Sequence, residues 1–126
     1  MIKRLVVAII LLAASTSGQP DRHLDEWYAS YNHAYFQDEL PAKVIITRNL
    51  RDDRFIALTE YSGGFYHIEF NKKYTVSDIT ERETLLHEMC HLRQFVEHDD
   101  EFDQHGRHWQ ACMHKLADEK AFENLW

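Results

Sequence analysis

The sequence predicts a single α+β domain, in which helical and strand segments occupy separate stretches of the chain. Apolar residues recur every three or four positions in the first third of the chain and again throughout its last third. Between these stretches lie short runs rich in β-branched and aromatic residues, and a Gly-Gly pair separates two of the runs. With 126 residues, the chain is long enough for one hydrophobic core of ordinary size.

The first eighteen residues have the pattern of a secretory signal peptide. Two basic residues precede a run of ten apolar residues, Leu5 to Ala14, and small residues follow up to Gly18. Ten apolar residues are too few to span a bilayer comfortably; an uncleaved anchor and a buried N-terminal helix are the alternatives. We therefore expect a signal peptide at residues 1–18, a mature domain at 19–126, and export without stable membrane insertion after cleavage.

The elements of the mature domain are expected in the order helix, three strands, helix, helix. The first helix begins near Leu24 and ends before Leu40-Pro41, because the residue before a proline avoids the helical conformation. The strands are expected at Val44 to Thr47, Phe55 to Tyr61 and Phe65 to Phe70, with Ser62-Gly63-Gly64 as a hairpin turn.

Two helices are expected after the strands. Thr80 and Glu83 have the spacing of a capping box, which predicts a helix from about Glu81 to Glu97. A last helix is expected from Gly106 or Arg107 to about Phe122.

The run His87-Glu88-Met89-Cys90-His91 lies within the first of these two helices. Residues four apart on a helix lie on the same face, so His87 and His91 can both present a ring nitrogen to one zinc ion. Glu88 lies about 100° around the helix from His87, where it can accept a proton from water at the metal. This arrangement of two ligands and a carboxylate is typical of a zinc hydrolase, with Glu88 as the catalytic base.

A catalytic zinc ion needs a third protein ligand and one open position. His105 is our prediction for that ligand, because a Gly follows it at the entry to the last helix, where a Gly permits an unusual backbone angle. His108 is the first alternative and His98 the second, although for each of them we favour a solvated position in a loop or on a helix surface.

The chain resembles the SprT-like (Spartan-like) zinc metalloproteases over about residues 23 to 122. The resemblance rests on three segments: Tyr35 to Pro41, the run from Leu85 to His91, and His105-Gly106 followed by Trp109. It implies a zincin-like minimal metalloprotease core, with a small sheet between an N-terminal helix and the helix that carries the motif.

By position, the resemblance implies that His87, His91 and His105 bind one zinc ion and that Glu88 is the general base. The implied function is a zinc metalloendopeptidase, which hydrolyses peptide bonds in protein or peptide substrates. Two other functions are compatible with the same residues: an exported zinc-binding module without turnover, and a zinc amidase that acts on cell-wall peptides. The presence of Glu88 favours an enzyme over the non-catalytic module.

The charge of the chain argues against a nucleic-acid partner. Removing residues 1–18 takes away Lys3 and Arg4 and no acidic residue, which leaves 12 basic residues against 21 acidic ones, a net charge of about −9. An acidic domain without basic clusters repels a phosphate backbone. We expect no nucleic-acid binding, and the sequence makes no prediction about oligomeric state.

By analogy with zincin-like proteases, a peptide substrate is expected to lie along an edge strand, either Phe65 to Phe70 or its hairpin partner. Phe65 and Phe70 themselves are expected in the core. The residues considered for binding the oxyanion are Tyr61, Tyr66, His67 and Tyr74.

The chain has two cysteines, Cys90 in the motif helix and Cys112 in the last helix. In an oxidising compartment they can pair and tie the two helices together. Two buried free thiols are the alternative.

Overall fold

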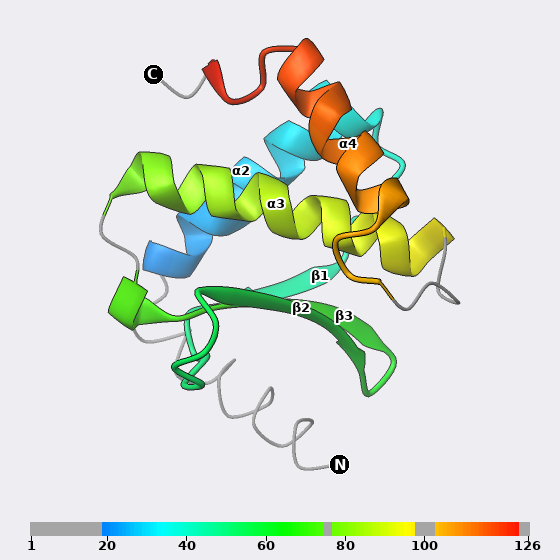
Figure 1. Ribbon diagram of the computed structural model, residues 1–126. Helices are drawn as coiled ribbons and strands as arrows, with labels where there is room; N and C mark the ends of the chain where they lie inside the picture. The colour runs from blue at the N-terminus through cyan, green and yellow to red at the C-terminus, as the bar shows by residue number, and fades with distance from the viewer. Residues whose placement is uncertain (1–18, 75–76, 98–102, 124–126) are drawn as a thin grey trace.

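The computed structural model describes residues 19–74, 77–97 and 103–123, with side chains from residue 23 onward. The predicted signal peptide and His98 lie outside these residues. Figure 1 shows the element order: helix α2 (Gln19–Phe36), strands β1 (Val44–Thr47), β2 (Ala57–Ser62) and β3 (Phe65–Phe70), the 3₁₀ turn η1 (Lys72–Tyr74), then helices α3 (Asp78–Glu97) and α4 (Arg107–Asp118). The predicted α+β class and the order of elements are confirmed. Within the described residues, no helix is both long and apolar enough to cross a membrane.

The sheet is mixed, and β3 is its central strand. β1 pairs with β3 in parallel, with Val44 opposite Tyr66, and β2 pairs with β3 antiparallel, with Ala57 opposite Phe70. The order β1-β3-β2 means that β3 is not an edge strand, so the first of the two edge predictions is wrong. Among the described strands, its hairpin partner β2 lies at an edge, beside α3.

The β2–β3 hairpin has the turn that its sequence predicts. Gly63 and Gly64 have φ values of 63° and 86°, the left-handed region that a type I′ hairpin loop requires of both central residues. β2 begins at Ala57 rather than at Phe55. The amide of Phe55 instead donates to the carbonyl of Asp52 at 3.1 Å, which closes a turn before the strand.

α3 begins earlier than the capping-box pattern predicts. The N-cap is Ser77, whose Oγ accepts a hydrogen bond from the Thr80 amide at 3.2 Å and whose carbonyl accepts the Glu81 amide at 3.0 Å. Thr80 is therefore the third residue of the helix, and the prediction that it caps the helix is wrong.

α4 ends at Asp118, four residues before the predicted end. Lys120 has a φ of 61°, and the amide of Ala121 turns back to donate to the carbonyl of Leu116 at 2.9 Å. A left-handed residue with this hydrogen bond is a common helix stop. Ala121 is consequently buried against the core although it lies outside the helix.

α2 ends in a hydrogen-bonded turn that leads to β1. Gln37 and Asp38 both have positive φ, and the side chain of Asn32 bonds both backbone groups of Leu40, donating to its oxygen at 3.0 Å and accepting from its nitrogen at 3.2 Å. Asn32 is buried, so these bonds satisfy an amide that has little access to water.

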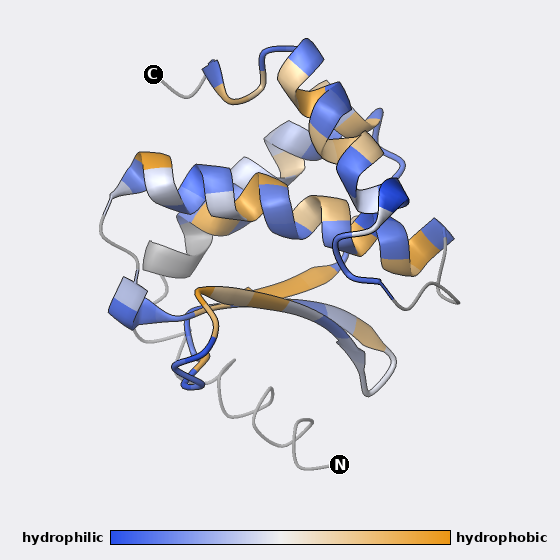
Figure 2. Cartoon of the chain, viewed as in Figure 1, coloured by the Kyte–Doolittle hydropathy of each residue, from blue (hydrophilic) through white to orange (hydrophobic). Residues whose placement is uncertain are grey.

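The hydrophobic core lies between α3 and the sheet. α2 contacts both α3 and β1, α4 packs on α3, and both helices contribute side chains to the core. In Figure 2, most of β1 is hydrophobic, whereas α4 is banded hydrophobic and hydrophilic, as expected for a helix with one buried face. The largest fully buried side chains are Phe36, Phe70, Leu24, Ile68, Leu85, Leu86, Met89, Leu92 and Leu116. Phe70 is in the core as predicted, but Phe65 is 50 % exposed, so that part of the prediction is wrong.

A buried ion pair joins β1's end to the first turn of α3. The Arg48 guanidinium donates through Nε to Glu81 Oε2 and through Nη2 to Glu81 Oε1, both at 3.0 Å. The side chains are 12 % and 7 % exposed. Removing one partner of a buried ion pair lowers the free energy of unfolding strongly, because the other charge stays buried without a partner.

We predict that Arg48→Met lowers the free energy of unfolding by about 3–5 kcal/mol, the cost of an unpaired buried carboxylate. The measurement is urea denaturation. Arg54→Met is the matched control, because Arg54 pairs with Asp52 at the surface and its loss should cost less than about 1 kcal/mol. Equal effects of the two substitutions would contradict a structural role for the Arg48–Glu81 pair.

Candidate metal centre

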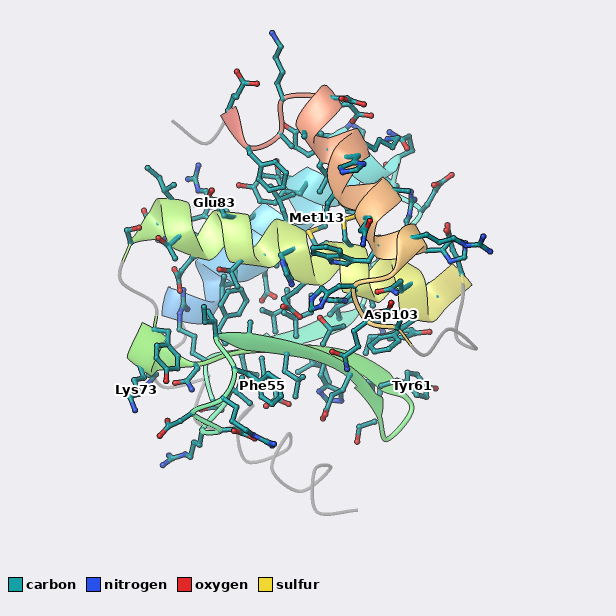
Figure 3. All side chains as sticks on the ribbon, viewed as in Figure 1. Phe55, Tyr61, Lys73, Glu83, Asp103 and Met113 are labelled. Carbon is teal, nitrogen blue, oxygen red and sulfur yellow. A yellow bond between two sulfur atoms is a disulfide. The ribbon has the colours of Figure 1, made fainter. Side chains whose placement is uncertain are left out.

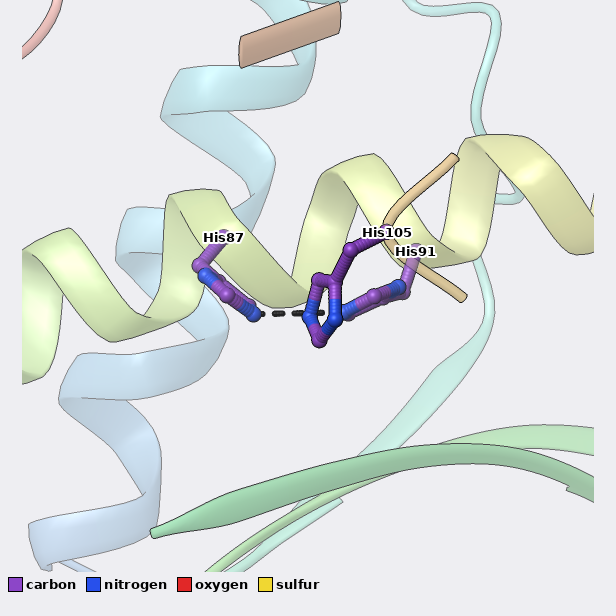
Figure 4. A group of neighbouring side chains, drawn as sticks. All are labelled: His87, His91 and His105. Carbon is purple, nitrogen blue, oxygen red and sulfur yellow. Dashed lines mark hydrogen bonds between the residues drawn. The ribbon is translucent and has the colours of Figure 1, made fainter. Parts of the chain in front are cut away.

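His87 and His91 face one another along one side of α3. Their Nε2 atoms are 3.1 Å apart and their ring centroids 4.9 Å apart (Figure 4). Both side chains are half-buried. The helix pitch therefore brings the two imidazoles together as the spacing of the motif predicts.

His105 joins them from the segment that precedes α4. Its ring centroid lies 5.5 Å from that of His87 and 4.8 Å from that of His91. The candidate ligand atoms of these three residues lie within 4.8 Å of one another, and among the described residues no other such group of His, Cys, Asp and Glu occurs. His108, the alternative to His105, is on the first turn of α4 and is not part of this group.

Short backbone and side-chain bonds hold the His105 segment in place. The Asp103 carboxylate accepts the His105 amide at 3.2 Å, and the Asp103 carbonyl accepts the Gly106 amide at 3.1 Å. Gly106 has a φ of −75°, which any residue can adopt, so the predicted need for an unusual backbone angle is wrong. Gly106 is instead a buried N-cap at the start of α4.

Trp109 packs against all three imidazoles. Its ring centroid lies 4.9 Å from that of His87, 5.5 Å from that of His91 and 4.6 Å from that of His105. Its indole nitrogen also donates to the His87 carbonyl at 3.4 Å. Sequence reasoning placed Trp109 in the last helix and did not predict this packing. The available signal was its position four residues after His105 at the entry to a helix.

Glu88 lies beside this cluster and is 5 % exposed. Its Oε1 accepts a hydrogen bond from Thr59 Oγ1 of β2 at 2.6 Å, and its Oε2 lies 3.9 Å from His87 Nε2. Burial raises the pKa of the carboxyl to about 7, although the bond from Thr59 acts in the opposite direction. A carboxyl with a pKa near neutrality can both take up and release a proton.

The imidazoles of His87 and His91 are held in their neutral form. Burial, reinforced by the neighbouring His91 and His105, lowers the pKa of His87 to about 4. Burial also lowers the pKa of His91. The neighbouring His105 lowers this pKa as well, whereas the hydrogen bond to Gln94 raises it. Neutral imidazoles are the form that binds a metal, so no proton need be displaced from these two rings at neutral pH.

The donor set fits a zinc ion. Two nitrogens bound to a tetrahedral zinc at about 2.0–2.1 Å are roughly 3.3 Å apart, and the Nε2 atoms of His87 and His91 are 3.1 Å apart. Three imidazoles leave one of four positions open, as catalytic zinc sites require. His105 is exposed and precedes the helix, so its ring has room to complete the set.

A cavity of about 160 Å³ lies beside the three rings. A second hollow of about 520 Å³ continues towards the start of α3, and the two share Phe55, Ala57, His87 and Glu88. One wall of the two hollows is therefore formed by β2 together with Phe55 and Ile56, the two residues before it, and the opposite wall is formed by α3. The first cavity is lined by Phe55, Ala57, Leu58, Thr59, His87, Glu88, His91, Gln94, Phe95, Gln104 and His105.

The four residues considered for the oxyanion do not line this cavity. The Tyr74 hydroxyl donates to a backbone carbonyl at 2.8 Å, and His67 is buried with Nε2 3.0 Å from the Ser62 carbonyl. Tyr61 and Tyr66 pack against one another, and Figure 3 shows Tyr61 near the hairpin end of the sheet. The structure thus gives no support to these four predictions.

A disulfide joins the two helices around the site. Cys90 and Cys112 are bonded, with their Cα atoms 5.7 Å apart, and the link is visible in Figure 3 as the yellow bond between α3 and α4. Both residues are buried. The pairing that the sequence left open is therefore present, and it lies between the helix that carries His87 and His91 and the helix that follows His105.

We predict that His105→Ala lowers the zinc affinity more than about 100-fold, since loss of a ligand should exceed the roughly 10–100-fold effect of losing an outer partner. His108→Ala should leave the affinity unchanged. Titration against a chromophoric chelator measures both. The opposite ranking would make His108 the third ligand.

Comparison with known proteins identifies a family that the chain matches. A model of the SprT-like family matches residues 24–124, a range that includes all three histidines, Glu88 and Trp109. No curated protein and no solved structure matches the chain. The family match covers nearly the whole of the described chain and indicates a metalloprotease-like domain. The chain belongs to the SprT-like family.

Proposed function

We propose that this protein is a zinc-dependent metallopeptidase that hydrolyses peptide bonds in protein or peptide substrates. The observation that carries the proposal is Glu88, a carboxyl buried beside the histidine cluster and held there by Thr59. Burying a carboxyl group is unfavourable unless the group is paired or used. A module that only stored zinc, or a non-catalytic remnant, would need the three imidazoles but would have no use for Glu88.

His87, His91 and His105 would hold the zinc ion. When bound, zinc supplies Lewis acidity, which polarises a carbonyl and lowers the pKa of water towards about 7. The half-buried position of His87 and His91 limits the water around the site and strengthens the electrostatic interactions in it.

Glu88 supplies the proton transfers. Its Oε2 is the oxygen nearer to His87, while Oε1 is held by the Thr59 hydroxyl, so one oxygen is fixed and the other faces the site. That oxygen takes a proton from the water that attacks the peptide carbonyl and later delivers it to the leaving nitrogen. Thr59 thus orients the base without reacting itself.

The groove between α3 and β2 is where an extended substrate would lie. β2 is an edge strand among the described strands, and Ala57, Leu58 and Thr59 line the cavity beside the histidines. An edge strand offers backbone hydrogen bonds to any extended peptide, while the hollows on either side of His87 accept side chains. This arrangement favours a peptide or an unfolded protein segment as substrate.

We also propose that the protein acts after export from the cytoplasm. The Cys90–Cys112 disulfide supports this location, because disulfides persist in oxidising compartments. The net charge of about −9 after removal of residues 1–18 argues against a nucleic-acid substrate or partner.

We predict that Glu88→Gln lowers the rate of hydrolysis about 10²–10⁴-fold, the usual contribution of a general base, while zinc binding and folding are retained. Cleavage of casein or of a quenched fluorescent peptide, with and without a zinc chelator, measures the rate.

Glu26→Gln is the matched control, since it makes the same change at an exposed position on α2 and should leave the rate unchanged. Wild-type rates in the Glu88→Gln variant would exclude Glu88 as the base. Hydrolysis that resists the chelator would exclude a metallopeptidase.

A further inference from the structure

Gln94 is a buried polar residue of α3 that contacts both segments of the metal centre. It is 6 % exposed and lies three residues after His91, hence on the same side of the helix. Its Oε1 is 3.1 Å from His91 Nδ1, and its Nε2 donates to the Asp103 carbonyl at 3.0 Å.

We propose that Gln94 is a positioning residue of the metal centre. It sets the proton of His91 on Nδ1, so that the Nε2 lone pair faces the metal position, and it ties this ring to the segment that carries His105. The inference rests on the proposed metal ligation by His91 and His105, and it adds a residue that neither the motif nor the family match assigns.

The direction of the Gln94 amide follows from its partner in the backbone. A carbonyl oxygen only accepts hydrogen bonds, so the Asp103 carbonyl must face the amide nitrogen of Gln94. This leaves Oε1, which also only accepts, facing His91 Nδ1. The backbone carbonyl of Asp103 therefore determines that the oxygen of the Gln94 amide, and not its nitrogen, faces His91.

The direction of the amide in turn sets the tautomer of His91. Because Oε1 cannot donate, Nδ1 must carry the ring proton, and a neutral imidazole then has its lone pair on Nε2. Nε2 is the atom that lies 3.1 Å from His87 Nε2, within the histidine cluster. Metal-binding histidines commonly have the other ring nitrogen fixed in this way.

The same side chain restrains the third histidine. The Asp103 carbonyl accepts both Gln94 Nε2 and the Gly106 amide, while the Asp103 carboxylate accepts the His105 amide. Gln94 therefore holds the backbone two residues before His105 against α3. One buried amide links a ligand on the helix to a ligand on the following segment.

The first experiment compares zinc affinity in two full-length variants. Gln94→Met removes both hydrogen bonds at similar volume, and we expect the zinc dissociation constant to rise about 10–100-fold. Asn32→Leu is the matched control. Asn32 is also a buried amide that ties a helix to the segment after it, but it does so at the end of α2 and contacts none of the three histidines. It should lower the denaturation midpoint and leave the dissociation constant within about twofold of wild type.

The second experiment reads the tautomer directly, by long-range ¹H–¹⁵N NMR of the histidine rings in the full-length, metal-free chain at pH 8. His91 of the wild type should carry its proton on Nδ1. Gln94→Glu should keep that tautomer, because a carboxylate still accepts from Nδ1, whereas Gln94→Met should lose the preference for it.

Three results would overturn the proposal: a wild-type His91 protonated on Nε2, loss of the Nδ1 tautomer in Gln94→Glu, or wild-type zinc affinity in Gln94→Met. The wild-type spectrum and Gln94→Glu decide the matter even where Gln94→Met fails to fold. A wild-type chain that bound no zinc would instead refute the metal centre itself, so the two failures are distinguishable.

Discussion

Three imidazole rings from two separate segments must present their nitrogens at one point, and the rest of the structure depends on this convergence. The pitch of α3 brings His87 and His91 together, but the position of His105 depends on how α4 packs on α3. The Cys90–Cys112 disulfide and the Trp109 ring, which contacts all three imidazoles, both act at this junction. These contacts resemble ordinary core packing, but here they also hold the three histidines in place.

The sheet contributes through its topology. Because β3 is central, β2 lies at the edge beside α3, and its Thr59 reaches Glu88. A strand that had to pair on both sides would not leave a groove for an extended peptide along α3. The order of three short strands therefore determines both the support of the proposed base and the edge along which the proposed substrate would lie.

Local sequence patterns predicted a helix, strand or turn well where the signal lies within a few residues. They failed where a neighbouring residue or a tertiary contact determines a helix boundary or the burial of a side chain. β1 and β3 have the predicted bounds, and the Gly63-Gly64 turn is as expected. The capping box at Thr80 failed because Ser77 provides an equally good cap three residues earlier. Phe65 was expected in the core from its residue type, but its position beside the hairpin turn leaves it half exposed.

The sequence by itself determined the α+β class and the pair of histidines four residues apart with their adjacent carboxyl, because helix pitch and residue chemistry act over short distances. It favoured His105 as the third histidine but left His108 and His98 as alternatives, and the structure brings His105 to the pair. Only the tertiary structure decided which strand forms the edge, that Cys90 and Cys112 pair, and that Thr59, Gln94 and Trp109 surround the site. Thr59 lies in a different element from the motif, and the spacing of Gln94 from His91 or of Trp109 from His105 does not by itself show what either side chain contacts. Their roles arise from the packing of β2 and α4 against α3, and a one-dimensional pattern carries no record of that packing.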